Sequence, residues 1–361
     1  KTTLSNLSSW TKTKRVSGSI LNYPTKDYLI PEPFGCTLHI SPWNYPFQLA
    51  LNTVIGAVAA GNTVVLKPSE YAHFTSGIVN DIIVEAFKPE HVCVIQGDAQ
   101  TSANLLSLRW DYVFFTGSTN VGKIVAKASA ENLTPYTLEL GGKNPLVVLK
   151  DADIDQAVQG SVVGSFLYQG QICMASSRIY VEQPVYDEFL TKFLVATQHL
   201  GMGDLRSPST MIGPIIHERQ RKRIKEHIQD ATTKGAKVLC GGNWQQNCCQ
   251  PTILTDINAQ MRISREETFG PVTTLHAVGS ADEALKLAND SNHGLTASIY
   301  TTNLTQAMRF AEHLEAGMVH INGTTIQDEP HIPFGGVGDS GFGRESTDPD
   351  LSDFTEWKWV T

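Results

Sequence analysis

The sequence predicts an α/β fold built on a doubly wound parallel sheet. Short apolar runs alternate with helical patterns from about Gly35 onward, and the strand-like runs are continuously apolar. Continuously apolar strands are typical of parallel sheets that helices cover on both faces. The chain has 361 residues, more than one hydrophobic core usually organises, so we expect at least two domains of this class.

The first half of the chain contains four strand-like runs, at 36–40, 63–66, 92–95 and 112–115. Helical patterns follow at 49–60, at 78–87 and from about 121. The first of these helices should end at Gly61, because glycine adopts the left-handed conformation that ends many helices. Ligands of such sheets bind beyond the carboxyl ends of the strands, which is where Asn44, Lys67 and Gly117 fall.

A second α/β unit should begin with the apolar run 146–149. Either Asp151 or Asp153 can cap the helix that follows, and Gly170 should close it. Cys173 lies in the loop just beyond. Further helical patterns lie at 189–200, 221–235, 281–289 and 304–316.

Composition argues against two kinds of partner. The formal net charge is −8, so the chain has no overall attraction for nucleic-acid phosphates or anionic lipids. Its longest strictly apolar stretch, near 54–61, is too short to cross a bilayer, and no charged-then-apolar signal peptide opens the chain. We expect neither a nucleic-acid partner nor membrane association.

The six cysteines indicate a reducing compartment. No pair has the C-x-x-C spacing of a zinc site, and six are too few for a disulfide-stapled secreted scaffold. We therefore expect a cytoplasmic protein without a metal site. Cys36, Cys93 and Cys240 lie in apolar runs, as buried structural thiols do, whereas Cys248 and Cys249 lie in a polar stretch.

Two residues have the surroundings of catalytic groups. Cys173 is flanked by small and polar residues after a helix, which leaves its thiol accessible, although a buried structural cysteine is the common alternative. Glu139 lies between apolar residues at the end of a strand-like run. Its carboxylate is either paired with Lys143 or serves as a general base whose pKa a dry pocket raises.

Three further features could bind a ligand. Gly117-Ser118-Thr119-Asn120-Val121-Gly122 leads into a helix and could present backbone amides to a pyrophosphate, but it matches no standard phosphate-binding motif. Lys67 and Glu70 follow a strand, where the usual interpretation is a solvated ion pair. The glycine-dense stretch 334–343 requires tight turns or close approach to a ligand.

Taken together, six motifs resemble the aldehyde dehydrogenase superfamily over nearly the whole chain. In order they are Pro42-Trp43-Asn44-Tyr45-Pro46-Phe47, Lys67-Pro68-Ser69-Glu70, Phe115-Thr116-Gly117-Ser118-Thr119, Leu138-Glu139-Leu140-Gly141-Gly142-Lys143, Gly170-Gln171-Ile172-Cys173 and Glu266-Glu267-Thr268-Phe269-Gly270-Pro271. The separation between Glu139 and Cys173 also matches that of the family's general base and nucleophile.

The resemblance implies a mechanism. Cys173 would attack an aldehyde to form a thiohemiacetal, whose oxyanion would be held by the Asn44 amide and the Cys173 backbone N–H. Glu139 would activate the water that hydrolyses the resulting thioester to a carboxylic acid. A thiol esterase-like hydrolase using the same Cys/Glu pair, or a catalytically silent truncated homologue, is the alternative.

The resemblance also implies a nicotinamide cofactor. The residues that it places there are Trp43, Lys67, Pro68, Glu70, Gly117, Ser118, Gly122, Glu267 and Phe269. Lys67 and Glu70 would contact the adenosine ribose, and Glu267 and Phe269 the nicotinamide ribose and ring. A carboxylate suits a free ribose 2′-hydroxyl and repels a 2′-phosphate, so Glu70 favours NAD, with NADP as the alternative.

The two halves resemble different subfamilies. The first half is similar to class 3 aldehyde dehydrogenases, and the second to benzaldehyde and vanillin dehydrogenases. These likenesses imply an aromatic or medium-chain aliphatic aldehyde as substrate. Two segments that resemble the family's oligomerisation elements, Ser17–Pro33 and Phe354–Val360, imply a homodimer, with a tetramer as the alternative. Phe166, Tyr168, Ile172 and Met174 either offer apolar surface to an aryl ring or belong to the core.

The family pattern implies a Rossmann-like cofactor domain, a second α/β catalytic domain and a small β oligomerisation element. The expected boundaries are 1–16 for a remnant of the cofactor domain, 17–34 for an oligomerisation hairpin, 35–140 for the dinucleotide-binding domain, 141–344 for the catalytic domain and 345–361 for an oligomerisation strand. Members of the superfamily carry more chain before the segment that matches Leu4–Pro33. By this resemblance, we expect that the N-terminal part of the family chain is missing.

Overall fold

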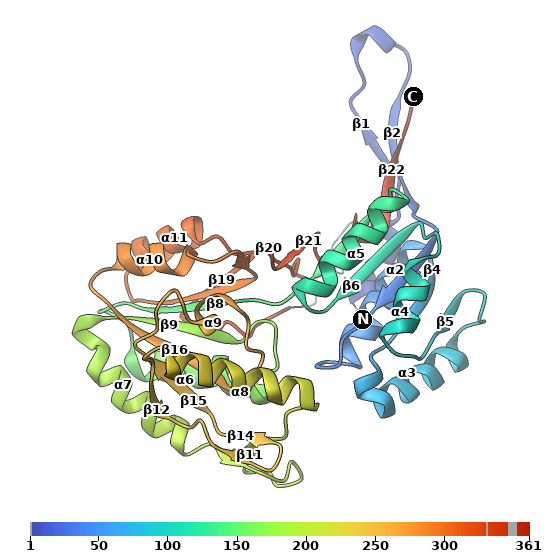
Figure 1. The fold of residues 1–361 in the computed structure, drawn as a ribbon. Coiled ribbons are helices and arrows are strands. Elements are labelled where there is room, and N and C mark those ends of the chain that lie inside the picture. Colours follow the sequence, from blue (N-terminus) through green and yellow to red (C-terminus); the bar gives the residue numbers. More distant parts are fainter. Residues whose placement is uncertain (1, 330, 346–351) are drawn as a thin grey trace. The chain divides into compact units, whose positions relative to one another are not determined.

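The structure, a computed structural model, describes residues 2–329, 331–345 and 352–361 (Figure 1). The expectations that concern Lys1, Pro330 and 346–351 lie outside the described residues. The chain divides into two compact units. Unit 1 comprises Lys1–Glu139, Asp328–Gly335 and Gly341–Thr361, and unit 2 comprises Leu140–Gln327 and Gly336–Ser340.

Unit 1 is built on a six-stranded sheet in the order β21-β7-β6-β3-β4-β5. Its strands are β3 (Cys36–Ile40), β4 (Thr63–Lys67), β5 (Val92–Val94), β6 (Tyr112–Thr116), β7 (Tyr136–Glu139) and β21 (Gly341–Phe342). All pairings are parallel except that of β21 with β7. The chain runs from β3 to β4 and β5 on one side, then returns to β6 and β7 on the other. This reversal beside β3 is the switch point of a doubly wound sheet.

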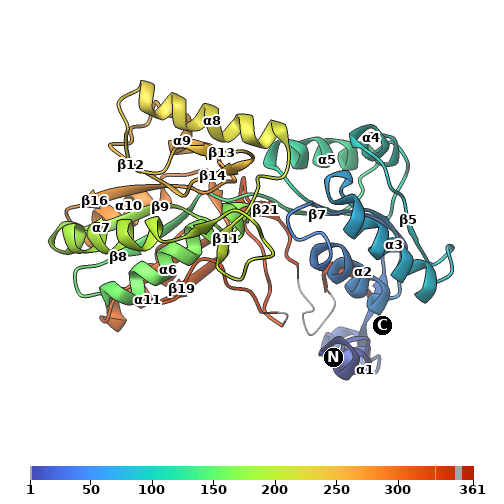
Figure 2. The same cartoon turned by 90° about the horizontal axis from the view of Figure 1, so that it is seen from below.

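Helices cover both faces of this sheet. They are α1 (Thr2–Trp10), α2 (Gln48–Ala60), α3 (His73–Ala86), α4 (Ala99–Leu106) and α5 (Thr119–Glu131). Figure 2 shows α4 and α5 on one side of the sheet and α2 on the other. α2 ends as predicted at Gly61, whose φ of 97° is left-handed. Val54 of α2 and Val79 of α3 pack with Leu66 of β4 in one buried cluster.

The core of unit 1 contains a buried histidine. His39 of β3 is 1% exposed, and its ring stacks on Phe114 and Phe354 with centroid distances of 5.8 and 5.6 Å. Burial lowers the pKa of His39 to about 3, so the imidazole is neutral. Because Phe354 comes from the C-terminal segment, that segment completes the core that the first 139 residues begin.

A separate three-stranded sheet extends from unit 1 (Figure 1). Its order is β1-β2-β22, and both pairings are antiparallel. The strands are β1 (Lys14–Val16), β2 (Asp27–Pro33) and β22 (Thr355–Val360). Trp357 and Trp359 of β22 are 37% and 62% exposed, so this small sheet carries aromatic surface.

Unit 2 is built on a seven-stranded sheet in the order β12-β15-β16-β9-β8-β18-β19. The strands are β8 (Asn144–Val148), β9 (Ser176–Glu182), β12 (Lys237–Cys240), β15 (Thr252–Thr255), β16 (Val272–Val278), β18 (Thr296–Tyr300) and β19 (Met318–Ile321). All pairings are parallel except that of β12 with β15. The short strands are β10 (Gly201–Met202), β11 (Thr210–Ile212), β13 (Trp244–Gln245), β14 (Cys248–Cys249), β17 (His293–Gly294) and β20 (Val337–Gly338).

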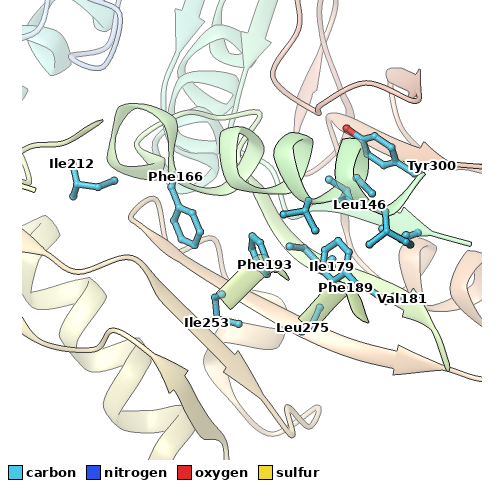
Figure 3. Packing of buried hydrophobic residues seen from close by; sticks show 14 residues of the cluster. Leu146, Phe166, Ile179, Val181, Phe189, Phe193, Ile212, Ile253, Leu275 and Tyr300 are labelled. Carbon is cyan, nitrogen blue, oxygen red and sulfur yellow. The ribbon is translucent and has the colours of Figure 1, made fainter. Parts of the chain in front are cut away.

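Consecutive residues of β8 belong to different cores. Leu146 and Val148 pack with α6 and α7, whereas Val147 packs with α10 and α11. The helices of unit 2 are α6 (Ile154–Phe166), α7 (Gln183–Gln198), α8 (Glu218–Thr233), α9 (Arg262–Arg265), α10 (Ala281–Asn289) and α11 (Leu304–His313). Figure 3 shows rings of α6 and α7, including Phe166 and Phe193, packed near Leu275 and Ile179. Burial of both strand faces explains why the strands read as continuous apolar runs.

These two sheets confirm the predicted α/β class with doubly wound parallel strands. Three local expectations were wrong. The helix expected to close at Gly170 ends at Phe166, because Tyr168 and Gln169 adopt left-handed conformations that no α-helix can include. The expected buried thiols are not fully buried: Cys36 is exposed because it opens its strand at the edge of the core, and Cys93 and Cys240 are half-buried. Cys248 and Cys249, expected in a polar loop, are buried because they form β14.

The described part of the chain shows neither a bilayer-spanning helix nor a metal-binding cluster. None of its helices combines the length and hydropathy that a bilayer crossing requires. Within residues 2–329, 331–345 and 352–361, no three His, Cys, Asp or Glu side chains gather in a way that could hold a metal ion.

Candidate active site

The switch point of unit 1 presents polar groups at the ends of adjacent strands. Ser41 follows β3, and Thr116 is the last residue of β6, the neighbour of β3. Both hydroxyls are buried, and neither has a hydrogen-bond partner among the described residues. Buried hydroxyls normally find partners, so unsatisfied ones at this edge are what a polar ligand would meet.

The next strand end carries an ion pair. Lys67 closes β4 and is 3% exposed, and its Nζ lies 2.9 Å from Oε2 of Glu70. The turn between them contains the buried Pro68 and the Ser69 hydroxyl, which accepts a hydrogen bond from the Tyr71 amide. The Glu70 side chain remains 35% exposed. The buried ammonium thus holds a carboxylate that still faces solvent, so the pair is not the fully solvated one considered from sequence.

In the turn before α5, the amides of the two glycines already donate hydrogen bonds within the protein. The Gly117 N–H donates to the Glu139 carbonyl at 2.9 Å, and the Gly122 N–H donates to the Ser118 carbonyl at 2.9 Å. A side chain at Gly117 would lie 2.5 Å from the Phe115 ring. Ser118 is exposed at the N-cap position, where its side chain makes no capping bond. A ligand here would approach the helix N-terminus past Ser118.

Trp43 and Asn44 lie in the irregular segment between β3 and α2. Asn44 is 4% exposed, whereas Trp43 is half-buried. The turn into α2 is fixed by the Leu49 amide, which donates to the Tyr45 carbonyl at 3.0 Å. Both predicted residues therefore lie at the carboxyl end of the central strand.

Glu139 is a buried carboxylate without a conventional hydrogen bond. It closes β7 and is 3% exposed, and neither oxygen has a hydrogen-bond partner among the described residues. Burial raises its pKa well above the usual value, and the Glu345 charge adds to this shift while Arg344 opposes it. A side chain at Gly335 would lie 2.7 Å from Oε1, so the glycine-dense segment packs closely on this carboxylate.

In unit 2, Cys173 follows a left-handed turn. Tyr168, Gln169 and Gly170 have φ values of 57°, 58° and 63°. A Cβ at Gly170 would lie 2.3 Å from the Gly270 carbonyl oxygen, so the turn packs tightly on the neighbouring segment. Cys173 is half-buried and forms no disulfide. Its thiol is thus carried on a short loop whose start is sterically fixed.

The apolar residues around Cys173 differ in exposure. Phe166, Ile172 and Met174 are 0%, 2% and 7% exposed, and Phe166 belongs to the main core of unit 2. Tyr168 is 42% exposed. Within this unit, Tyr168 is therefore the one of the four that presents aromatic surface to solvent.

Helix α8 holds the segment of Glu267 and Phe269. Gln220 Nε2 donates to the Thr268 and Phe269 carbonyls, both at 2.8 Å. Arg223 Nε donates to the Glu267 carbonyl at 2.9 Å. Phe269 has a left-handed φ of 56°. Side chains from one helix therefore fix the backbone at consecutive residues of this segment.

Two ionisable groups of unit 2 have strongly shifted pKa values. Burial raises the pKa of Glu267 to about 7, although its Oε1 accepts the Gly142 N–H at 3.1 Å. Burial also lowers the pKa of Lys143 to about 7, with Arg178 contributing. The Lys143 ammonium has no hydrogen-bond partner among the described residues. Such opposite shifts at neighbouring groups are common in functional sites.

Sequence reasoning missed several residues that support these groups. They are Ser41, Thr116, Asn144, Gln220, Arg223 and His227. Asn144 could have been noticed, because it is a polar residue opening an otherwise apolar strand-like run. The α8 residues Gln220, Arg223 and His227 were harder to recognise as supporting residues, because a charged amphipathic helix usually lies on the solvated surface.

Nearly the whole chain matches one protein family. The aldehyde dehydrogenase family matches residues 7–360 of this sequence. The chain belongs to the aldehyde dehydrogenase family. This confirms the resemblance found in the motifs.

Individual members of the family show how close the likeness is. Salicylaldehyde dehydrogenase of Pseudomonas sp. strain C18 is 39% identical over 344 residues, which are 93% of this chain and 71% of that protein. Vanillin dehydrogenase of Pseudomonas fluorescens is 39% identical over 336 residues, 91% and 70% of the two chains. The solved structure of salicylaldehyde dehydrogenase from Pseudomonas putida G7, complexed with salicylaldehyde, has a TM-score of 0.94 and 37% identity, covering 99% of this chain and 75% of that one.

Members of the aldehyde dehydrogenase family oxidise aldehydes, and relatives of this chain use NAD+ or NADP+. The predicted enzyme class, an NAD(P)-dependent aldehyde dehydrogenase, is therefore confirmed at the level of the family.

Proposed function

We propose that this chain oxidises an aromatic or medium-chain aliphatic aldehyde to the carboxylic acid, with NAD as the preferred cofactor and Cys173 as the nucleophile. The observation that carries the proposal is the Cys173 loop. Cys173 is half-buried and outside any disulfide, and the turn before it packs closely on the Gly270 carbonyl. The names of the salicylaldehyde and vanillin dehydrogenases support an aromatic substrate.

In the first stage, the Cys173 thiolate attacks the aldehyde carbon. A carbon–sulfur bond forms, and the carbonyl π pair moves to oxygen as an oxyanion. The Asn44 amide and the Cys173 backbone N–H would donate hydrogen bonds to this oxygen. When bound, the nicotinamide supplies the hydride acceptor that the side chains of this protein lack.

In the second stage, Glu139 acts on water. Its carboxylate removes a proton as the water oxygen attacks the thioester carbon, the carbon–sulfur bond breaks, and Cys173 leaves as the thiolate. The buried carboxylate suits this role because burial raises its pKa, which makes it a stronger base. The product is the carboxylic acid.

The residues of unit 1 fit a dinucleotide. The unsatisfied Ser41 and Thr116 hydroxyls at the switch point offer hydrogen bonds to a polar ligand. Lys67 and Glu70 would bind the adenosine ribose, and the exposed Glu70 carboxylate favours a free 2′-hydroxyl. The other proposed contacts are Trp43, Pro68, Gly117, Ser118 and Gly122 in unit 1, and Glu267 and Phe269 in unit 2.

We also propose a homodimer in the cytoplasm, with a tetramer as the alternative. β22 pairs with β2 along one edge, and strand edges are common sites of pairing between chains. The segments 17–34 and 345–361 would form this interface, of which residues 346–351 lie outside the described ones. The six cysteines form no disulfide, as a reducing compartment favours.

An aldehyde panel tests the function. Purified protein is incubated with benzaldehyde, salicylaldehyde or hexanal, with NAD and NADP in parallel, and reduced nicotinamide is followed by absorbance. We expect turnover with NAD that Cys173→Ala abolishes. Cleavage of an aryl ester that depends on Cys173, without any aldehyde oxidation, would instead favour the esterase-like alternative. The absence of both activities would favour a catalytically silent homologue.

A further inference from the structure

Asn144 binds the backbone of the nucleophile loop. It is the first residue of β8 and is 1% exposed. Its Nδ2 donates to the Cys173 carbonyl at 2.7 Å and to the Ala175 carbonyl at 2.9 Å. Its Oδ1 accepts the backbone N–H of Thr296 at 3.3 Å. One buried amide therefore ties two carbonyls of the loop to the adjoining strand β18.

The residue type matters at this position. Two carbonyl oxygens converge on one nitrogen, so the partner must supply two N–H groups from a single short side chain. An aspartate is nearly the same size, but its oxygens would face those carbonyls as acceptors, so both carbonyls would lose the bond from the residue 144 side chain. A buried carbonyl that loses its donor is destabilising, so we expect the loop to move away.

Gly142 packs closely against this amide and the nucleophile loop. A Cβ at Gly142 would lie 2.4 Å from Asn144 Oδ1 and 2.8 Å from the Cys173 carbonyl oxygen. On the other side of the nucleophile, the Ala175 N–H donates to the Ile172 carbonyl at 3.0 Å. The turn that contains Cys173 is thus held by the hydrogen bond from Ala175 to Ile172. It is also held by the bonds from Asn144 to the Cys173 and Ala175 carbonyls.

We propose that Asn144 is a positioning residue for Cys173. By fixing the Cys173 carbonyl, it sets the peptide planes on either side of the nucleophile, and with them the directions of the thiol and of the backbone N–H. The inference rests on the proposed function, in which that thiol attacks the aldehyde and that N–H binds the oxyanion. Asn144 itself need not contact the substrate.

Asn62 provides a matched control. It is 0% exposed, its Nδ2 donates to the Ala57 and Phe354 carbonyls at 3.1 and 2.8 Å, and its Oδ1 accepts the Gly35 N–H at 2.9 Å. The amide therefore makes the same set of bonds as Asn144, but in the core of unit 1 rather than at the nucleophile. Asn62→Asp should lower stability without a specific effect on the chemical step.

The test compares Asn144→Asp, Asn144→Ser and Asn62→Asp with the unsubstituted enzyme. We expect Asn144→Asp to lower kcat about 100-fold, the scale of a 1 Å misplacement, with KM for NAD changed less than about threefold. Asn144→Ser keeps one donor and should give an intermediate kcat, which preserves the test if the aspartate variant does not fold. The rate of iodoacetamide labelling of Cys173, read by mass spectrometry of its peptide, should also change in both Asn144 variants.

The outcomes separate this inference from the proposed function. If Cys173→Ala is inactive but both Asn144 variants keep the normal kcat and labelling rate, the positioning role is wrong and the function stands. If Asn62→Asp lowers kcat as much as Asn144→Asp, the effect is one of general stability and the inference is again overturned. If Cys173→Ala keeps aldehyde oxidation, the proposed function itself fails.

Discussion

His227 Nε2 lies 3.2 Å from the Glu266 carboxylate oxygen Oε2. The histidine is 0% exposed, and its Nδ1 lies 3.1 Å from the Thr268 hydroxyl. Arg262 lowers the pKa of Glu266, so the carboxylate is ionised and accepts the bond. The neutral imidazole with its proton on Nε2 satisfies both contacts, and burial lowers the His227 pKa to about 4.

This relationship predicts a pH-dependent stability. The folded protein binds no proton at His227 until the pH approaches 4, whereas the unfolded chain binds one near 6.5. The free energy of unfolding should therefore fall as pH is lowered from 6.5 towards 4. Urea unfolding at several pH values should show a shallower fall for His227→Gln, and an unchanged one for His91→Gln at an exposed position. Other buried histidines such as His39 supply the remaining slope; identical slopes in all three proteins would contradict this account.

Glu139→Gln should separate the two stages of the reaction. Without its base, the enzyme should transfer one hydride per active site and then stall, because general-base catalysis contributes roughly 10²–10⁴-fold. Rapid mixing should show a burst of reduced cofactor followed by slow turnover. In the unsubstituted enzyme, deacylation should accelerate as pH rises through the raised pKa of Glu139. A variant without a burst and with normal steady-state turnover would remove Glu139 from the mechanism.

Glu70→Gln should weaken the preference for NAD. The substitution removes the carboxylate that would bind ribose hydroxyls and repel a 2′-phosphate, and it leaves the Lys67 ammonium without its ionic partner. We expect the ratio of kcat/KM for NAD over NADP to fall about tenfold, or ~1.4 kcal/mol. Parallel kinetics with both cofactors measure it, with Glu131→Gln, another exposed site in unit 1, as control. An unchanged ratio would mean that Glu70 does not distinguish a ribose 2′-hydroxyl from a 2′-phosphate.

Gly170→Ala should damage the nucleophile loop. Gly235 offers a comparison, since its φ of 104° is also left-handed but a Cβ there would meet no atom within 4 Å. Gly235→Ala should therefore cost only the conformational strain, about 1–2 kcal/mol. Gly170→Ala adds a clash with the Gly270 carbonyl and should lose more stability, and most of the activity with it. Equal losses of stability and activity in the two variants would show that the close contact is unimportant.

Phe354→Ala should destabilise unit 1 strongly. Phe354 is 1% exposed and packs between the rings of the core. Its truncation should cost about 3–5 kcal/mol, measured as the free energy of unfolding in urea. Phe74→Ala removes a ring that is 80% exposed and should cost little. Similar values for both would contradict the role of Phe354 in the core.

The sequence revealed the strand ends better than the loops. Lys67 and Glu139 close β4 and β7 because apolar runs end where a strand leaves the core, and that transition is visible in the composition. The turn at Tyr168 and Gln169 was not predictable. Neither residue type favours positive φ, so their conformation is imposed by packing around Gly170 rather than by local preference.

Hydrogen bonds between residues far apart in the sequence could not be predicted either. The contact of Asn144 with the Cys173 carbonyl joins residues 29 positions apart, and that of Gln220 with Thr268 joins residues 48 apart. Each depends on which strands become neighbours, and local patterns do not state this. The motifs could therefore suggest which residues react, but not which residues hold them.

The place of Phe354 in the core also has a consequence for biosynthesis. The strands β3 to β7 leave the ribosome early, but the ring that fills their core follows the whole of unit 2. At roughly 5–20 residues per second, the intervening ~200 residues take about ten seconds or more to translate. During that interval, the place of the Phe354 ring beside His39 and Phe114 is not filled by the C-terminal segment. Because apolar surface of the unit 1 core stays uncovered during synthesis, we expect the nascent chain to aggregate more readily and to need chaperones more than the finished protein does.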